Sequence, residues 1–128
     1  MRLLLDTHAL LWWLNGDMRL SLPARGAIAD QQTVVLVSAA SAWEIATKVR
    51  IGKLAGAIYV IEHLPEILAD QSFLHLPISL DHARRAGLMA GVHRDPFDRM
   101  LIAQAQIDGL TLVSNEVLFD TCGAQRLW

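Results

Sequence analysis

Four acidic residues stand at positions where an α/β protein gathers chemical groups. Asp6, Glu44 and Glu116 each follow a short apolar run, and Asp98 lies in the first turn of a helix that we predict over 95–109. Since open parallel sheets bind ligands outside the carboxyl ends of their strands, we expect all four carboxylates to face one edge of a sheet. Negative charges that converge repel one another, so a positive group must offset them.

A divalent metal ion is the counter-ion that these residue types favour. Mg²⁺ and Mn²⁺ prefer oxygen ligands, which carboxylates supply. A zinc site has little support, because the chain has one cysteine, Cys122, and its five histidines lack metal-finger spacing. A hard metal could bridge and polarise a phosphodiester and supply a metal-activated water as nucleophile. The pattern therefore indicates metal-dependent phosphodiester chemistry.

Three of the acids also have explanations in which they only support a helix. Asp6 is a favoured N-cap for the helix that follows it, and Glu116 would be a favourable charge in the first turn of a final helix. Glu44 could close a capping box with Ser41 or pair with Lys48, four residues further on. For Asp6 the two explanations are equally supported. For Glu44 and Glu116, each taken alone, the helix explanation is the better one.

Asp98 has a local explanation too, because it lies three residues after Asp95, which can cap the same helix. Leu101 and Ile102 follow three and four positions later, which puts Asp98 beside the apolar stripe and partly inside the protein. A carboxylate in such a place needs a cation. Helix capping explains each of the four acids separately but gives no reason for them to converge, so their coincidence favours a metal site.

The rest of the pattern supplies a sheet that would position these acids. Apolar runs predict strands at 3–5, 33–37, 73–78 and 110–113, and Pro77 suggests an edge position for the third. Helical patterns lie between and around them, at 9–14, 21–30, 41–52, 54–70, 79–91 and 95–109, with Pro65 interrupting the fourth. Alternating strands and helices indicate an α/β class with a mainly parallel sheet, and the length predicts a single domain over 1–128.

Composition limits the setting in which the chain works. An apolar fraction of 53% is high for a soluble monomer, which predicts that some apolar surface meets a partner. Trp12 and Trp13 cannot both face the core from adjacent helical positions, so at least one should be exposed or in a contact. A net charge of −2 gives no bulk positive field for nucleic acid. No apolar run is long enough for a membrane span or a signal peptide, so we expect a cytoplasmic protein with no membrane association.

Four motifs together resemble one known family. They are LLDTH at 4–8, SAASAWEI at 38–45, HRDPFDR at 93–99 and LVSNE at 112–116. The chain is similar over nearly its whole length to the PIN-domain ribonucleases, specifically the VapC-type toxins of bacterial type II toxin–antitoxin pairs.

This resemblance implies a three-layer α/β/α sandwich and metal-dependent cleavage of RNA by an endoribonuclease. It implies a Mg²⁺ or Mn²⁺ site on Asp6, Glu44 and Asp98, a homodimer, and inhibition by a cognate antitoxin protein. The family commonly has Asp at the position of Glu116, so here a longer side chain must reach the metal or leave its role to water. Ser114 matches a family position that often carries a hydroxyl near the acids, although it could equally be an N-cap.

Basic residues around the acids could hold the phosphates of RNA. Lys48, Arg94 and Arg99 are the candidates that we take as substrate-binding, with Arg50 and Lys53 nearby. Charges at helix ends are usually only solvated, which is the better explanation for most of them individually. The five histidines show no consistent geometry, and we interpret them as structural.

Two other classes of protein could also gather acids at the end of a parallel sheet. A Mg²⁺-dependent phosphoryl-receiving signalling domain would need adjacent acids ahead of its first-strand loop and a lysine after its last strand. Here Asn115 and Glu116 stand where that lysine would be sought. A non-catalytic binding module, in which all four acids serve as caps, is the other alternative, and metal binding would distinguish it.

Overall fold

Five parallel strands form the centre of the part of the chain that the computed structural model describes, residues 1–91 and 95–128. Their order in the sheet is β3-β2-β1-β4-β5. The strands are β1 (Arg2–Leu5), β2 (Val34–Ser38), β3 (Leu74–Leu76), β4 (Thr111–Val113) and β5 (Gln125–Leu127). Four of them lie where the sequence predicts strands, and β3 is at an edge, as Pro77 suggests. β5 is an additional strand that the apolar pattern does not reveal.

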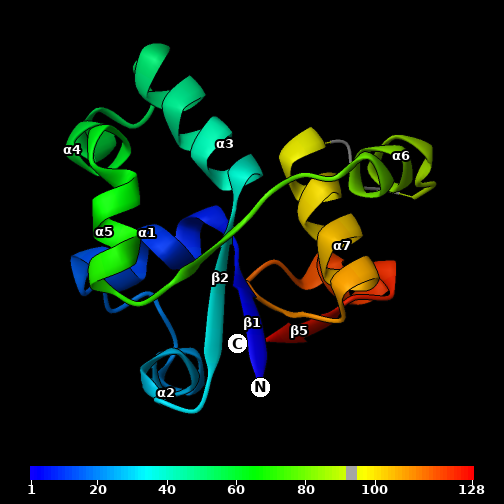
Figure 1. The fold of residues 1–128 in the computed structure, drawn as a ribbon, viewed down its shortest axis with the longest axis horizontal. Coiled ribbons are helices and arrows are strands. Elements are labelled where there is room, and N and C mark those ends of the chain that lie inside the picture. The colour runs from blue at the N-terminus through cyan, green and yellow to red at the C-terminus, as the bar shows by residue number, and fades with distance from the viewer. Residues whose placement is uncertain (92–94) are drawn as a thin grey trace.

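Helices fill the intervals between the strands (Figure 1). They are α1 (Thr7–Asn15), α2 (Leu22–Ala29), α3 (Ala39–Arg50), α4 (Ile58–Glu62), α5 (Leu64–Asp70), α6 (Leu80–Leu88) and α7 (Pro96–Asp108), with 3₁₀ turns η1 (Ala55–Ala57) and η2 (Val117–Cys122). The helical pattern over 54–70 is divided into η1, α4 and α5, and Pro65 lies in the first turn of α5, where its missing N–H costs nothing. The helix predicted to run to residue 91 ends at Leu88.

Alternation along the strands builds two separate cores, one on each face of the sheet. Leu3 and Leu5 of β1 pack with apolar residues of α1, α2 and α5. Leu4, between them, points the other way and packs with Leu101 and Ile102 of α7. Figure 1 shows α1, α2, α4 and α5 on one side of the sheet and α6 and α7 on the other. The predicted three-layer α/β/α sandwich is therefore confirmed.

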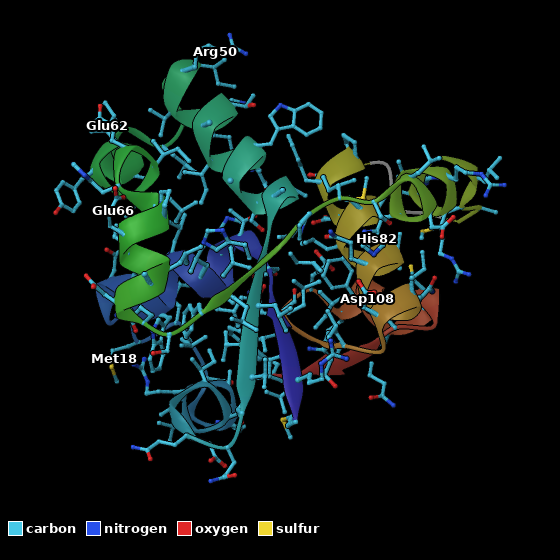
Figure 2. The ribbon with its side chains drawn as sticks, viewed as in Figure 1. Met18, Arg50, Glu62, Glu66, His82 and Asp108 are labelled. Carbon is cyan, nitrogen blue, oxygen red and sulfur yellow. The ribbon has the colours of Figure 1, made fainter. Side chains whose placement is uncertain are left out.

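Two helices of one layer are joined by a partly buried polar contact. The ring nitrogen Nε2 of His82, on α6, lies 2.8 Å from Oδ2 of Asp108, on α7, and Figure 2 shows the two side chains between these helices. The other ring nitrogen of His82, Nδ1, accepts a hydrogen bond from the backbone N–H of Ser79 and closes a capping box. For His82 the predicted structural role is confirmed. Within the described residues, no helix is long and apolar enough to cross a membrane.

Candidate active site

An acidic pocket of about 300 Å³ lies at the carboxyl ends of β1 and β4. The structure brings the four predicted acids to this one pocket and adds a fifth, Asp95. The pocket is lined by Asp6, Thr7, His8, Trp12, Glu44, Lys48, Asp95, Asp98, Asn115 and Glu116. The topology explains this, because β1 and β4 are neighbours and α3 and α7 begin at the same edge of the sheet.

Asp6 both caps a helix and faces the pocket. As N-cap of α1 it accepts a hydrogen bond of 2.7 Å from the backbone N–H of Ala9. The side chain is buried, and this burial raises the pKa of the Asp6 carboxyl, while a hydrogen bond with the hydroxyl of Ser114 acts in the opposite direction. The N-cap explanation is therefore confirmed for Asp6, and because the same carboxylate lines the pocket, its role in binding a metal stays a prediction.

Ser114 is fully buried at the end of β4 and contacts two groups of the site. Besides its hydrogen bond with Asp6, its Oγ accepts a hydrogen bond of 3.0 Å from the backbone N–H of Glu116. It is not the N-cap of η2, since that position belongs to Glu116. The hydroxyl thus fixes the first acid and the loop that carries the last one.

Glu44 is buried and held by two polar partners. The hydroxyl of Thr7 donates to Oε1 at 2.6 Å, and Nζ of Lys48 pairs with Oε2 at 2.5 Å. The predicted Glu44–Lys48 pair is confirmed. The predicted capping box with Ser41 is wrong, because α3 begins one turn earlier with Ser38 as its N-cap, which leaves Ser41 inside the helix.

Asp98 shows most clearly how crowded the negative charge is. Burial is the main cause that raises its pKa to about 7. Further increases come from four neighbouring carboxylates, those of Asp95, Glu44, Asp6 and Glu116. At neutral pH this group is therefore only partly ionised, and a bound cation would favour its charged form.

The two remaining acids are engaged with backbone amides. Asp95 is the N-cap of α7, as predicted, and accepts hydrogen bonds from the N–H groups of Phe97 and Asp98 at 2.8 and 3.2 Å. Glu116 caps η2 and accepts from the N–H of Leu118 at 3.0 Å. Both carboxylates still line the pocket, so both remain within its electrostatic field.

The donor chemistry of this pocket fits a hard divalent cation, although no metal cage is preformed. Among the described residues, no three Asp, Glu, His or Cys side chains are grouped so that they could hold one ion as they stand. Several of these acids already have partners, since Lys48 pairs with Glu44 and backbone amides donate to Asp6 and Glu116. A metal would have to replace some of these contacts, and the mutual repulsion of the acids favours that exchange.

The predicted basic residues are only partly brought to the pocket. Lys48 lines it. Arg99 does not, since its guanidinium donates to the backbone carbonyl oxygens of Ala86 at 3.1 Å and of Met89, which joins α7 to the end of α6. Arg94 lies outside the described residues, so its predicted contact with substrate stays a prediction.

Sequence reasoning missed several residues of the pocket, of which His8 is the most important. The interpretation of all five histidines as structural does not anticipate that His8 is exposed and lines the pocket beside Asp6. Thr7 and Trp12 were not expected there either. Their spacing in the sequence could have placed them near Asp6. Thr7 and His8 follow Asp6 directly, and Trp12 lies four residues after His8, on the same face of α1.

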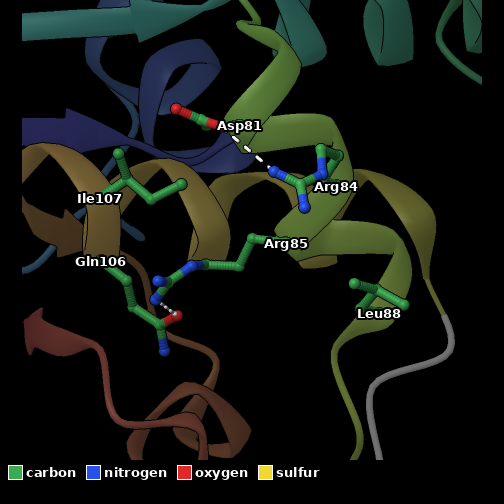
Figure 3. Close-up of a pocket in the computed structure, with 6 residues that line it drawn as sticks. All are labelled: Asp81, Arg84, Arg85, Leu88, Gln106 and Ile107. Carbon is green, nitrogen blue, oxygen red and sulfur yellow. Dashed lines mark hydrogen bonds and ion pairs between the residues drawn. The ribbon is translucent and has the colours of Figure 1, made fainter.

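A larger hollow of about 520 Å³ between α6 and α7 has a different character (Figure 3). Its charged groups have partners within the hollow: Asp81 pairs with Arg84 at 3.7 Å, and Arg85 donates to the side-chain oxygen of the neutral Gln106 at 3.2 Å. Asp81 is the only carboxylate among the described residues that line it. The acidic pocket is therefore the better candidate for chemistry.

The fold and the pocket define an α/β protein whose site lies outside the carboxyl ends of a parallel sheet. The family model described as PIN domain matches residues 3–121, which is most of the chain, so the protein belongs to the PIN domain family. No curated protein matches the sequence closely enough to add to this assignment.

Solved structures share the fold at low sequence identity. VapBC2 from Rickettsia felis, bound to a DNA fragment of its promoter, has a TM-score of 0.69 and 16% identity, covering 99% of this chain and 98% of that one. VapC20 from Mycobacterium tuberculosis, a Sarcin-Ricin loop cleaving toxin, has a TM-score of 0.68 and 16% identity, covering 95% of each chain. FitAcB from Neisseria gonorrhoeae has a TM-score of 0.62 and 18% identity, covering 98% and 96%. At such identities the likeness concerns the fold.

Proposed function

We propose that this protein is a metal-dependent endoribonuclease and the toxin of a toxin–antitoxin pair. The observation that carries the proposal is the convergence of Asp6, Glu44, Asp98 and Glu116 on one pocket. RNA is the preferred substrate class because VapC20, which has the same fold, cleaves the Sarcin-Ricin loop.

In this proposal Asp6, Glu44 and Asp98 hold Mg²⁺ or Mn²⁺, and Glu116 reaches the ion directly or through water. When bound, the ion polarises the phosphodiester and lowers the pKa of a water molecule. The hydroxyls of Thr7 and Ser114 orient Glu44 and Asp6 through the contacts described above. Lys48, which pairs with Glu44, would be free to contact a phosphate of the substrate if a metal took its place at that carboxylate.

The purified protein, freed of any partner, should cleave RNA only with Mg²⁺ or Mn²⁺. Attack of water on the phosphorus expels the 3′-oxygen, so each cut should leave a 5′-phosphate. Sequencing the ends of the cleaved RNA, with and without EDTA, measures both features. Cleavage that survives an excess of EDTA, or that leaves cyclic 2′,3′-phosphates, would contradict the proposal.

We also propose that a small antitoxin protein binds this chain. The complex would contain two copies of the chain, and the toxin would act in the cytoplasm, where RNA is found. R. felis VapBC2 and the Klebsiella pneumoniae toxin–antitoxin complex share the fold, and large apolar side chains are exposed here, among them Trp43 and Leu88. An apolar segment of the partner would cover such surface, and its Lys or Arg would enter the acidic pocket.

The partner should co-purify when the chain is expressed from its native operon. The complex should lack RNA cleavage, because the inserted cation occupies the carboxylates. Mass spectrometry of the purified complex identifies the second protein, and light scattering gives the number of copies. If the chain is expressed at high level without its operon neighbour and purifies alone, this would count against the proposal that it is a toxin.

A further inference from the structure

Two stacked rings line the acidic pocket without a role in the proposed cleavage. His8 and Trp12 lie one turn apart on α1, with ring centroids 5.6 Å apart and ring planes inclined by 24°. Both rings line the pocket that contains Asp6 and Asp98, and His8 is exposed. Trp12 is half-buried against Trp128, at 5.8 Å between centroids, so it gives the His8 ring a fixed support. The pair therefore presents an aromatic surface directly beside the carboxylates.

The same two rings also line a second hollow, which extends the acidic pocket along α1. This hollow has a volume of about 300 Å³ and reaches η1 and α4. Its wall is apolar at Leu54 and Val60 and carries an ion pair between Arg19 and Asp17, at 2.7 Å. The guanidinium of Arg19 lies 5.1 Å from the ring centroid of Trp12. Lys48 lies in the acidic pocket on the other side of the rings. The rings thus lie between the carboxylates and a surface that is apolar apart from the Arg19–Asp17 ion pair.

We propose that a nucleobase next to the cleaved phosphodiester stacks on the His8–Trp12 pair, an inference that rests on the proposed ribonuclease function. In a single-stranded RNA each phosphate is followed by a base, so a phosphate at the carboxylates brings a base to the adjoining rings. Every base offers a flat aromatic face, and stacking on an aromatic side chain tolerates any sequence. Lys48, in the acidic pocket, is placed to contact a flanking phosphate. Trp12 is the positioning residue, and His8 is the ring that contacts the base.

The test compares an RNA that has bases with one that lacks them. The ligands are fluorescein-labelled octa-adenylate and an abasic octamer with the same ribose-phosphate backbone, and the measurement is fluorescence anisotropy with Mg²⁺. All proteins carry Asp98→Asn, which removes one negative charge and prevents cleavage. Adding His8→Ala should weaken octa-adenylate binding about 5- to 150-fold, the range of a lost base stack. Binding of the abasic octamer should not change.

Two further variants separate the ring of His8 from its charge and from general surface effects. His8→Phe keeps an aromatic ring without an ionisable nitrogen and should restore octa-adenylate binding to within about threefold of the His8 protein. His63→Ala is a matched control, because His63 is exposed, its ring centroid lies 4.4 Å from that of Tyr59, and it lines neither hollow. This control should bind both ligands normally. Since His8 is exposed, its removal should not unfold the protein, and a melting curve verifies this.

Three outcomes would overturn the stacking proposal. The first is that the His8→Ala protein binds octa-adenylate as tightly as its parent does. The two rings would then be available to an apolar side chain of a protein partner instead. The second is an equal loss for octa-adenylate and the abasic octamer, which would assign His8 an electrostatic role. The third is a parent protein that binds no octa-adenylate. If wild-type protein still cleaves RNA with Mg²⁺, only the stacking proposal falls. If it cleaves none, the proposed function falls.

Discussion

The Asp98→Asn protein should lose RNA cleavage and yet, free of metal, melt at or above the temperature of the wild type. Asn keeps the shape of the side chain but is a poor ligand for a hard cation. We expect cleavage to fall on the order of a hundredfold or more, because a metal contributes several kcal/mol of transition-state stabilisation. Stability should not fall with it, because the substitution removes one of five crowded carboxylates.

The pH dependence of this stability gain follows from the pKa of Asp98. That pKa is raised from 3.8 to about 7 in the folded protein, so the folded state retains a proton that the unfolded state has already lost. Stability contributed by this group therefore decreases as the pH rises from about 4 to about 7 and stays low above that. At pH 8 the neutral Asn should stabilise the metal-free protein by about 1 to 2 kcal/mol, after a discount for the solvent that screens a half-buried group. The gain should shrink as the pH falls from 8 towards 5.

Thermal melts in EDTA at several pH values, with an RNA cleavage assay alongside, measure both effects. Asp81→Asn is the matched control, since Asp81 also lies in the first turn of a helix but is exposed in the hollow between α6 and α7. It should leave cleavage intact and give no gain at pH 8. If Asp98 were only a helix residue, Asp98→Asn would cleave RNA normally, because Asn serves well at helix starts.

The central strands and the best helix were predictable because their signals are local. Leu3, Leu4 and Leu5 form a run that is buried on both faces of the sheet. Asp95 and Pro96 mark the start of α7, and Gly109 ends it with a left-handed φ of 65°. Parallel topology then brings the ends of the strands to one edge. The convergence of the acids could thus be inferred without a structure.

Features that depend on distant contacts could not be predicted in this way. Ser38 and Ser41 are both residue types that favour the N-cap position. Ser38 caps α3 in the structure, where β2 extends to it and its hydroxyl donates to the side chain of Gln104, on α7, at 2.5 Å. β5 has three residues, is only partly buried and depends on pairing with β4. Arg99 turns to the end of α6, which its own neighbours in the sequence do not indicate. The partners of each side chain, which determine the site, come from such contacts.

Mg²⁺ should raise the melting temperature of the wild-type protein strongly and that of Asp98→Asn only weakly. A ligand that binds only the folded state stabilises it by about 2.7 kcal/mol when its free concentration is about 100 times the dissociation constant. For a domain of this size that corresponds to roughly 10 °C. The gain includes relief of the repulsion among the acids, which is why the wild type should benefit most.

The same titration ranks the ligands and tests the arrangement of the pocket. Asp6→Asn should reduce the Mg²⁺ shift about as much as Asp98→Asn, although it leaves the cap of α1 in place. Glu116→Gln should have the weakest effect, because this carboxylate is engaged with the backbone N–H of Leu118 as the cap of η2. Lys48→Met should increase the Mg²⁺ affinity, since the metal then no longer competes with an ammonium group for Glu44.

Asp81→Asn again serves as the control and should show the full shift of the wild type. Equal Mg²⁺ shifts in the wild type and in Asp98→Asn would mean that the ion binds elsewhere and that the acids at this edge of the sheet act only as helix caps.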